Sequence, residues 1–243
     1  MCHGRKARPM TDPTHLHPGV PGVAVTSGAF TPGDDLMAEQ RLSGLIVARL
    51  CHDLVGPVGA VSNGIDLLRE TSSAGVISDE DLALVTQSNQ RSADLLRLLR
   101  LAFGTASGDE HGIERAALVD DLATVLCTRR LHLAAIGREG PNLPAGAARI
   151  TALMALAGKL TAGVAGTMEL VFSPDAALPV RLSVIGEKAR LTPEMQAWLS
   201  GSLVPFPTSR EVELAVLPRV VAAAGGRIEA SDDGAGSVVI VVQ

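Results

Sequence analysis

Apolar and polar positions first alternate regularly after residue 34. From Leu42 to Leu68, apolar residues recur every three or four positions, which is the spacing of one face of an α-helix. The members of this apolar stripe are Leu42, Ile46, Leu50, Leu54, Val58, Val61, Ile65 and Leu68. Because Asp34 and Asp35 can each cap a helix N-terminus, we expect a helix that begins there and runs to about Glu70.

A second helix is predicted after a short turn. Ser78 can cap its N-terminus, and the three acidic residues that follow suit the positive end of a helix. Positions 82, 85, 89, 92, 96, 99 and 103 alternate in steps of three and four, which is the spacing of a coiled-coil seam, and Gly104 ends the pattern. A single hairpin buries only part of such apolar faces, so we expect two chains to form a dimeric four-helix bundle.

After Gly112 the pattern changes to short strands that alternate with helices. Helices are predicted at 114–127, 145–165, 193–200 and 209–224, and strands at 131–136, 167–173, 179–185, 228–231 and 238–242. Pro218 is expected to kink or divide the last helix. The predicted fold is therefore a helical hairpin, residues 35–107, followed by an α+β domain, residues 113–243, with helices packed on one sheet.

Composition narrows the class of protein. The 243 residues are 47% hydrophobic, which supports a packed core, while a net charge of −5 and 2% aromatic residues argue against a nucleic-acid-binding surface. Residues 1–34 are rich in Pro and Gly, so we expect a disordered N-terminal arm with no signal peptide. The apolar stretch 150–172 contains Lys159 and three glycines, which favours a buried helix and strand over a membrane span. We therefore expect a soluble, cytoplasmic protein.

His52 is the histidine whose position suggests chemistry. It lies on the first predicted helix, about 180–200° from the apolar stripe, and is therefore expected to face solvent. Gly56, Gly59 and Asn63 share its face within about a quarter turn. A glycine inside a helix costs up to about 1 kcal/mol, so these two glycines indicate either the close approach of a partner or loose packing between helices. Pro57 should kink the helix one turn beyond His52.

The sequence around His52 is similar to that of known signalling proteins. The segment His-Asp-Leu-Val-Gly-Pro at 52–57 resembles the H-box of two-component histidine kinases. Its continuation, Val-Gly-Ala-Val-Ser-Asn-Gly-Ile-Asp-Leu-Leu at 58–68, resembles more narrowly the ChpT family of alphaproteobacterial histidine phosphotransferases. The resemblance covers about 35–243 and leaves the N-terminal arm unexplained.

The resemblance assigns roles to residues of this helix. His52 would carry the phosphoryl group, and Asp53 would assist proton handling, although Asp53 could also be a solvated helix carboxylate. The interface with a receiver domain would include Arg49, Gly56, Pro57, Gly59 and Asn63. For Arg49, pairing with a partner carboxylate and simple solvation are both open. Cys51 is expected to be a small packing residue.

The second domain lacks the parts of a kinase ATP site. The helix at 145–165 offers no Asn, Asp or Glu where a kinase N-box would hold Mg²⁺. The segments 186–190 and 201–207 stand where a D-x-G-x-G loop and a glycine-rich lid would be expected. The resemblance therefore implies a degenerate ATPase-like domain without a nucleotide site. We expect this chain to bind no cofactor and no metal, with Mg²⁺ supplied by the receiver domain.

The predicted function is phosphoryl relay by a homodimeric histidine phosphotransferase. The resemblance implies a donor that is the receiver domain of a hybrid histidine kinase of the CckA type, and acceptors that are response regulators of the CtrA and CpdR type. Neither nucleic acid nor membrane is an expected partner. Two alternatives remain open, a histidine kinase with a divergent ATP site and a dimeric adaptor that binds receivers without transfer.

Overall fold

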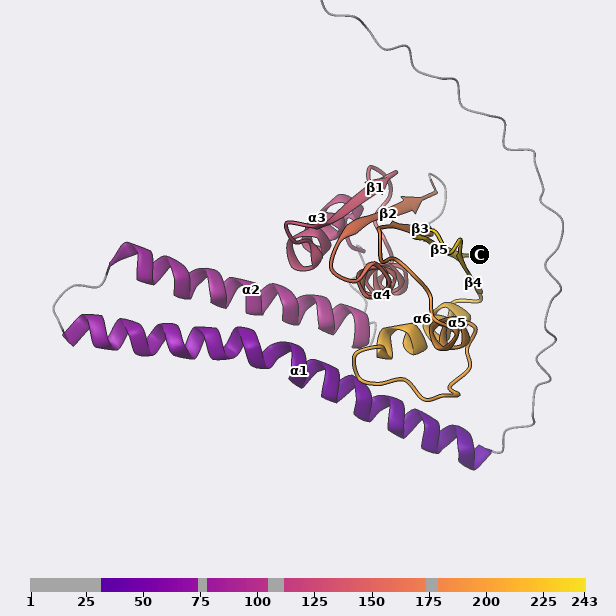
Figure 1. Ribbon diagram of the computed structural model, residues 1–243, viewed down its shortest axis with the longest axis horizontal. Coiled ribbons are helices and arrows are strands. Elements are labelled where there is room, and N and C mark those ends of the chain that lie inside the picture. The colour runs from indigo at the N-terminus through magenta and orange to yellow at the C-terminus, as the bar shows by residue number, and fades with distance from the viewer. Residues whose placement is uncertain (1–31, 74–77, 105–111, 174–178) are drawn as a thin grey trace, which may run out of the picture.

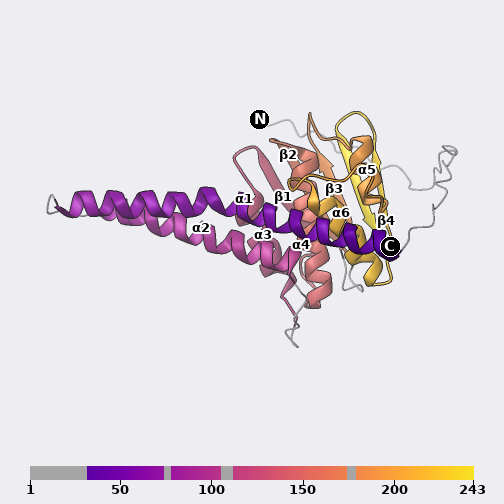
Figure 2. The same cartoon turned by 90° about the horizontal axis from the view of Figure 1, so that it is seen from below.

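A long helical hairpin forms the N-terminal part of the fold. The computed structural model describes residues 32–73, 78–104, 112–173 and 179–243, so most of the predicted arm at 1–34 lies outside it. Helix α1 (Pro32–Ser73) runs antiparallel to α2 (Asp79–Phe103), and the tip of the hairpin projects far from the rest of the molecule (Figures 1 and 2). Helix α1 thus begins slightly before, and ends slightly after, the predicted boundaries.

The ends and the packing of the hairpin follow from particular residues. Ser78 caps α2 as predicted, because its Oγ accepts a hydrogen bond from the Asp81 N–H at 3.1 Å, and the Gly104 N–H closes the helix on the Arg100 carbonyl. Pro57 lies inside α1, which stays helical through it and changes direction near its middle (Figure 1). Gly64 lets α1 and α2 approach closely, since a Cβ at this position would lie 2.5 Å from the Val85 Cγ2.

The C-terminal part is one five-stranded sheet with helices packed against it. The strands are β1 (Leu131–Ile136), β2 (Gly166–Phe172), β3 (Pro179–Ile185), β4 (Ile228–Asp232) and β5 (Ser237–Val242), and the helices are α3 (Arg115–Leu126), α4 (Ala145–Ala162), α5 (Pro193–Leu199) and α6 (Val212–Ala223). The strand order is β1-β2-β3-β5-β4, parallel between β1 and β2 and antiparallel elsewhere. All predicted elements are present. Helix α6 continues across Pro218, so this proline does not divide the helix, and a kink there stays a prediction.

The hairpin and the sheet share a hydrophobic core. Helix α4, the apolar stretch that we predicted to be a core helix, is buried along most of its length. The same core cluster includes Leu42 from α1 and Leu98 and Ala102 from α2, so the base of the hairpin is packed against the sheet domain. The Arg149 Nε adds a hydrogen bond to the Ala102 carbonyl at 3.1 Å. This packing fixes the position of α1 relative to α6.

The projecting part of the hairpin leaves its apolar seam open. Val58, Ile65, Leu82 and Leu96 are each about half exposed in the single chain. Among the described helices, the segment Leu36–Glu70 of α1 is long and apolar enough to cross a membrane by length and composition, and no residue of its apolar 18-residue window is buried. An exposed apolar stripe of this size calls for a partner surface.

Candidate functional site

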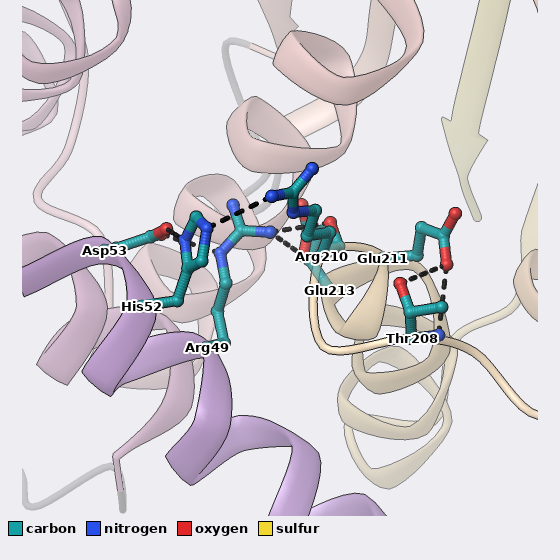
Figure 3. Close-up of polar contacts among 7 residues, drawn as sticks. All are labelled: Arg49, His52, Asp53, Thr208, Arg210, Glu211 and Glu213. Carbon is teal, nitrogen blue, oxygen red and sulfur yellow. Dashed lines mark hydrogen bonds and ion pairs between the residues drawn. The ribbon is translucent and has the colours of Figure 1, made fainter.

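His52 lies on α1 where this helix passes the start of α6 (Figure 3). Its side chain is 53% exposed, as predicted, and its Nδ1 lies 2.9 Å from the Asp53 Oδ1. Because a carboxylate accepts hydrogen bonds, we assign the ring proton to Nδ1, which leaves a lone pair on Nε2. Asp53 is therefore bonded to the histidine, and the alternative of a merely solvated carboxylate does not describe it.

Arg49 joins α1 to α6. Its Nε donates to the Asp53 Oδ2 at 2.7 Å, as the spacing of four residues on a helix allows, and its Nη1 donates to the Arg210 carbonyl at 2.6 Å. The same Nη1 lies 3.5 Å from the Glu213 Oε2, and the Arg49 side chain is 14% exposed (Figure 3). The structure thus places Arg49 in contacts within the chain rather than on an open surface that a partner carboxylate could reach.

Arg210 completes the site from the opposite side. Its Nη2 lies 3.3 Å from the His52 Nε2, although 158 residues separate the two in sequence. His52, Asp53, Arg49 and Arg210 therefore form a closed series of polar contacts, in which each residue touches the next. Figure 3 shows Arg49 between the His52–Asp53 pair and the Arg210 turn.

The turn that carries Arg210 is held by its own hydrogen bonds. The Glu211 Oε2 accepts from the Thr208 N–H at 3.0 Å and from the Thr208 Oγ1 at 2.6 Å, which resembles one half of a capping box at the start of α6. Further back, the Trp198 Nε1 donates to the Pro205 carbonyl at 2.6 Å. These contacts hold the segment between α5 and α6 at Pro205 and at Thr208, and they thereby fix the position of the Arg210 backbone.

A buried carboxyl group lies beneath the site. Glu213, in the first turn of α6, is 1% exposed, and neither of its oxygens has a hydrogen-bond partner of good geometry in the described part of the chain. Burial raises the pKa of Glu213 to about 7, and the Arg49 guanidinium opposes this rise. On α4, burial lowers the pKa of the Lys159 ammonium, while the negative charge of Asp53 opposes that change. Burial thus disfavours the charged form of both groups, the Glu213 carboxylate and the Lys159 ammonium.

Apart from Arg49, the predicted receiver-facing residues lie beside His52 on a more open surface. A Cβ added at Gly56 or Gly59 would meet no atom within 4 Å, so in the described part of the single chain the two glycines do not serve close packing between helices. Asn63 is exposed and Pro57 is partly buried, on the same helix. Cys51 is exposed, so its assignment as a packing residue was wrong. Contact of these positions with a receiver domain stays a prediction.

The described residues contain no group of three or more His, Cys, Asp and Glu that could hold a metal ion. The segment 186–190, where the resemblance led us to look for a kinase glycine loop, contains a tight turn bonded within the chain. The Gly186 N–H donates to the Gly236 carbonyl at 2.9 Å, and the Arg190 N–H donates to the Thr161 carbonyl at 3.2 Å. These amides are therefore already satisfied and do not point as free donors toward a phosphate.

Sequence patterns did not identify Arg210 or Glu213. Both lie outside the helix that carries the H-box, and only the folding of α6 against α1 brings them to His52. One signal was available. Glu213 is the single charged residue in the apolar run 212–217, and a charge inside such a run indicates a buried group with a special environment.

Comparisons with known proteins identify the family. The model of the histidine phosphotransferase C-terminal domain matches residues 114–236. Over 65 residues the chain is 38% identical to the protein phosphotransferase ChpT of Brucella abortus, and this match spans 27% of the chain and 29% of that relative. In structure the chain is similar to a solved bacterial phosphotransferase, with a TM-score of 0.65 and 21% identity, over 91% of this chain and 100% of the other.

The family match covers half of the chain, and the structural match extends the likeness of fold over both the hairpin and the sheet domain. A weaker likeness, with a TM-score of 0.43 and 17% identity, covers 88% of this chain and 45% of full-length ShkA in complex with AMPPNP. The chain belongs to the ChpT-type family of histidine phosphotransferases.

Proposed function

We propose that the chain relays a phosphoryl group from the aspartate of one receiver domain to the aspartate of another through His52. The observation that carries this proposal is the state of the imidazole. Its Nδ1 is bonded to Asp53, its Nε2 has a lone pair, and the side chain is half exposed on a helix face that two glycines leave open. A nucleophilic nitrogen that is oriented but accessible suits transfer between large partners.

The transfer step follows from this arrangement. The Nε2 lone pair attacks the phosphorus of the aspartyl phosphate, so the nitrogen–phosphorus bond forms as the bond between phosphorus and the aspartate oxygen breaks, and the receiver carboxylate leaves. The Nδ1 proton stays in place, and the ring gains a positive charge that the Asp53 carboxylate stabilises at 2.9 Å. The reverse step, onto a second receiver, uses the same atoms.

The partners are proposed from the family resemblance. The donor would be the receiver domain of a hybrid histidine kinase of the CckA type, and the acceptors would be response regulators of the CtrA and CpdR type, all met in the cytoplasm. The receivers would bring Mg²⁺ and the acidic pocket. We infer no cofactor of the chain's own, because hard oxygen ligands for Mg²⁺ are lacking on α4.

A homodimer is part of the proposal. Leu54, Val58, Val61 and Ile65 continue the apolar stripe of α1 beyond the shared core, and Leu82 and Leu96 extend it on α2. A second hairpin laid against this seam would cover it and complete a four-helix bundle. His52 lies on the other side of α1 from this stripe, so dimerisation would leave it accessible.

A labelling experiment separates this function from the two alternatives. A receiver domain carrying ³²P on its aspartate is mixed with the full chain, and a second receiver domain is then added. We expect label on the wild-type chain and afterwards on the second receiver, and no label with His52→Ala. The matched control is His132→Ala, at an exposed histidine on β1, which should behave as wild type.

Each alternative gives a different result. Labelling of His52 from ATP alone would favour the divergent kinase. Binding of both receivers without labelling of the wild-type chain, unchanged by His52→Ala, would favour the adaptor. Chelation of Mg²⁺ should stop the relay in every variant, because the metal requirement belongs to the receivers.

A further inference from the structure

We propose that Arg210 binds the phosphoryl group while it is on, or moving to, the Nε2 of His52. This inference rests on the function proposed above and adds a residue of the sheet domain to the catalytic site. The Arg210 Nη2 lies 3.3 Å from the nitrogen that forms the new bond, closer than any other cation shown at that atom in the described structure. A phosphoryl group attached there would place its oxygens within reach of the guanidinium.

The charge balance of the site distinguishes Arg210 from Arg49. The Arg49 guanidinium is bonded to the Asp53 carboxylate at 2.7 Å, so its charge is already compensated within the chain. In the described part of the chain, no carboxylate oxygen lies within ion-pair distance of the Arg210 guanidinium. Arg210 therefore brings an uncompensated positive charge to His52, and a guanidinium can bind two phosphoryl oxygens at once.

The backbone of Arg210 is anchored while its side chain is free to move. Its carbonyl accepts the hydrogen bond from Arg49 at 2.6 Å, and the Thr208–Glu211 contacts hold the preceding turn. The residue itself is exposed. The guanidinium can therefore leave the nitrogen and turn outward without moving α6, as an approaching phosphorus atom would require.

Arg210 changes its hydrogen-bond partner during the transfer. In the free protein, the guanidinium donates to the Nε2 lone pair. When the aspartyl phosphate arrives, Arg210 exchanges this contact for the phosphoryl oxygens, and the lone pair forms the bond to phosphorus as the receiver carboxylate departs. In the phosphorylated protein, Asp53 compensates the charged ring and Arg210 compensates the phosphoryl oxygens. Each charge of the phosphohistidine thus has a partner of opposite sign, and the transfer requires no further reactant.

The test compares Arg210→Ala and Arg210→Lys with Arg227→Ala in the full-length protein. Arg227 is an exposed arginine that contacts Glu229 and Gln243, so its removal changes the net charge equally without touching the site. Each protein is phosphorylated with potassium phosphoramidate and, separately, with a ³²P-labelled receiver domain. The rate of phosphohistidine formation and the ³¹P resonance of phospho-His52 are measured.

We expect Arg210→Ala to slow phosphorylation by both donors by about ten- to a hundredfold, less than a buried oxyanion-hole donor would contribute because Arg210 is exposed. Its ³¹P resonance should shift, Arg210→Lys should recover part of the rate, and Arg227→Ala should match wild type. An unchanged circular dichroism spectrum of Arg210→Ala and of Arg210→Lys would show that the fold is intact.

Two failures are distinguishable. Wild-type rates and an unshifted resonance in Arg210→Ala would overturn the role of Arg210 and leave the relay standing. If neither donor produced phosphohistidine in the wild-type chain, the relay itself would be wrong, and the role of Arg210 with it. An equal loss in Arg210→Ala and Arg227→Ala would also overturn the inference, because only general charge would then matter.

Discussion

Replacing Glu213 with Gln should stabilise the protein by an amount that increases with pH. The carboxyl group is 1% exposed, lacks a hydrogen-bond partner in the described residues, and has the Arg49 Nη1 at 3.5 Å as its ion-pair partner. Burial raises its pKa from 4.5 to about 7 in spite of this arginine. The fold therefore favours the protonated form, and Gln reproduces the size and neutrality of that form.

The sign of the effect follows from proton binding. Between pH 4.5 and about 7, folded chains hold a proton on Glu213 that unfolded chains have released, so the free energy of unfolding falls as the pH rises through this window. A pKa raised from 4.5 to about 7 corresponds to roughly 3 kcal/mol above that window. The advantage of Glu213→Gln over wild type should therefore be small near pH 4.5 and approach roughly 3 kcal/mol near pH 8.

Urea unfolding at several pH values, at one fixed protein concentration, measures this difference. Glu187→Gln is the matched control, because it makes the same chemical change at an exposed position in a surface turn. If Glu213→Gln were less stable than wild type near pH 8, the ion pair with Arg49 would outweigh the cost of burying the carboxylate. The physical account of this site would then be wrong.

Three further results are expected. Leu54→Asp should convert a dimer into a monomer in light scattering, because a charge cannot be buried in the seam at low cost, whereas a monomeric wild-type chain at micromolar concentration would refute the bundle. Gly56→Ala should raise the free energy of unfolding by up to about 1 kcal/mol, since its Cβ meets no atom within 4 Å, while Gly56→Leu should fold and yet slow transfer from a receiver. Calorimetric titration with ATP and Mg²⁺ should give no heat beyond dilution, and saturable micromolar binding would instead support the kinase alternative.

Much of the fold was predictable because local patterns and tertiary packing agree. The apolar stripe of α1, the Ser78 cap and the alternation in β5 each point to the element that forms. Pro218 does not divide α6, because tertiary packing of this helix, whose residues 212–217 are buried, keeps it continuous despite the local cost of proline. Helix boundaries differed by a few residues for the usual reason that helix ends fray.

The site was only half predictable, and the reason is topological. Within α1, the spacing of Arg49, His52 and Asp53 is local, so sequence alone places them on neighbouring turns. Arg210 and Glu213 come close to the His52 site through the packing of α6 on α1. This packing cannot be predicted from the spacing of residues along the chain. The same packing explains why Arg49, which alone on a helix would be solvated, is 14% exposed and held by three groups.

The sheet domain, which we predict to bind no nucleotide, still has a physical role in this arrangement. The hairpin by itself would keep the His52–Asp53 contact, because both residues are on α1. It would lose the acceptor that fixes Arg49, since this acceptor is the Arg210 carbonyl, and it would lose the guanidinium at Nε2. Helix α6 is held in place by the core that α4 shares with Leu42, Leu98 and Ala102, so the position of Arg210 depends on the whole sheet domain. Under the proposed relay, the domain contributes to the phosphoryl group a positive charge that is anchored through the Arg210 backbone, a task that requires its fold and no bound nucleotide.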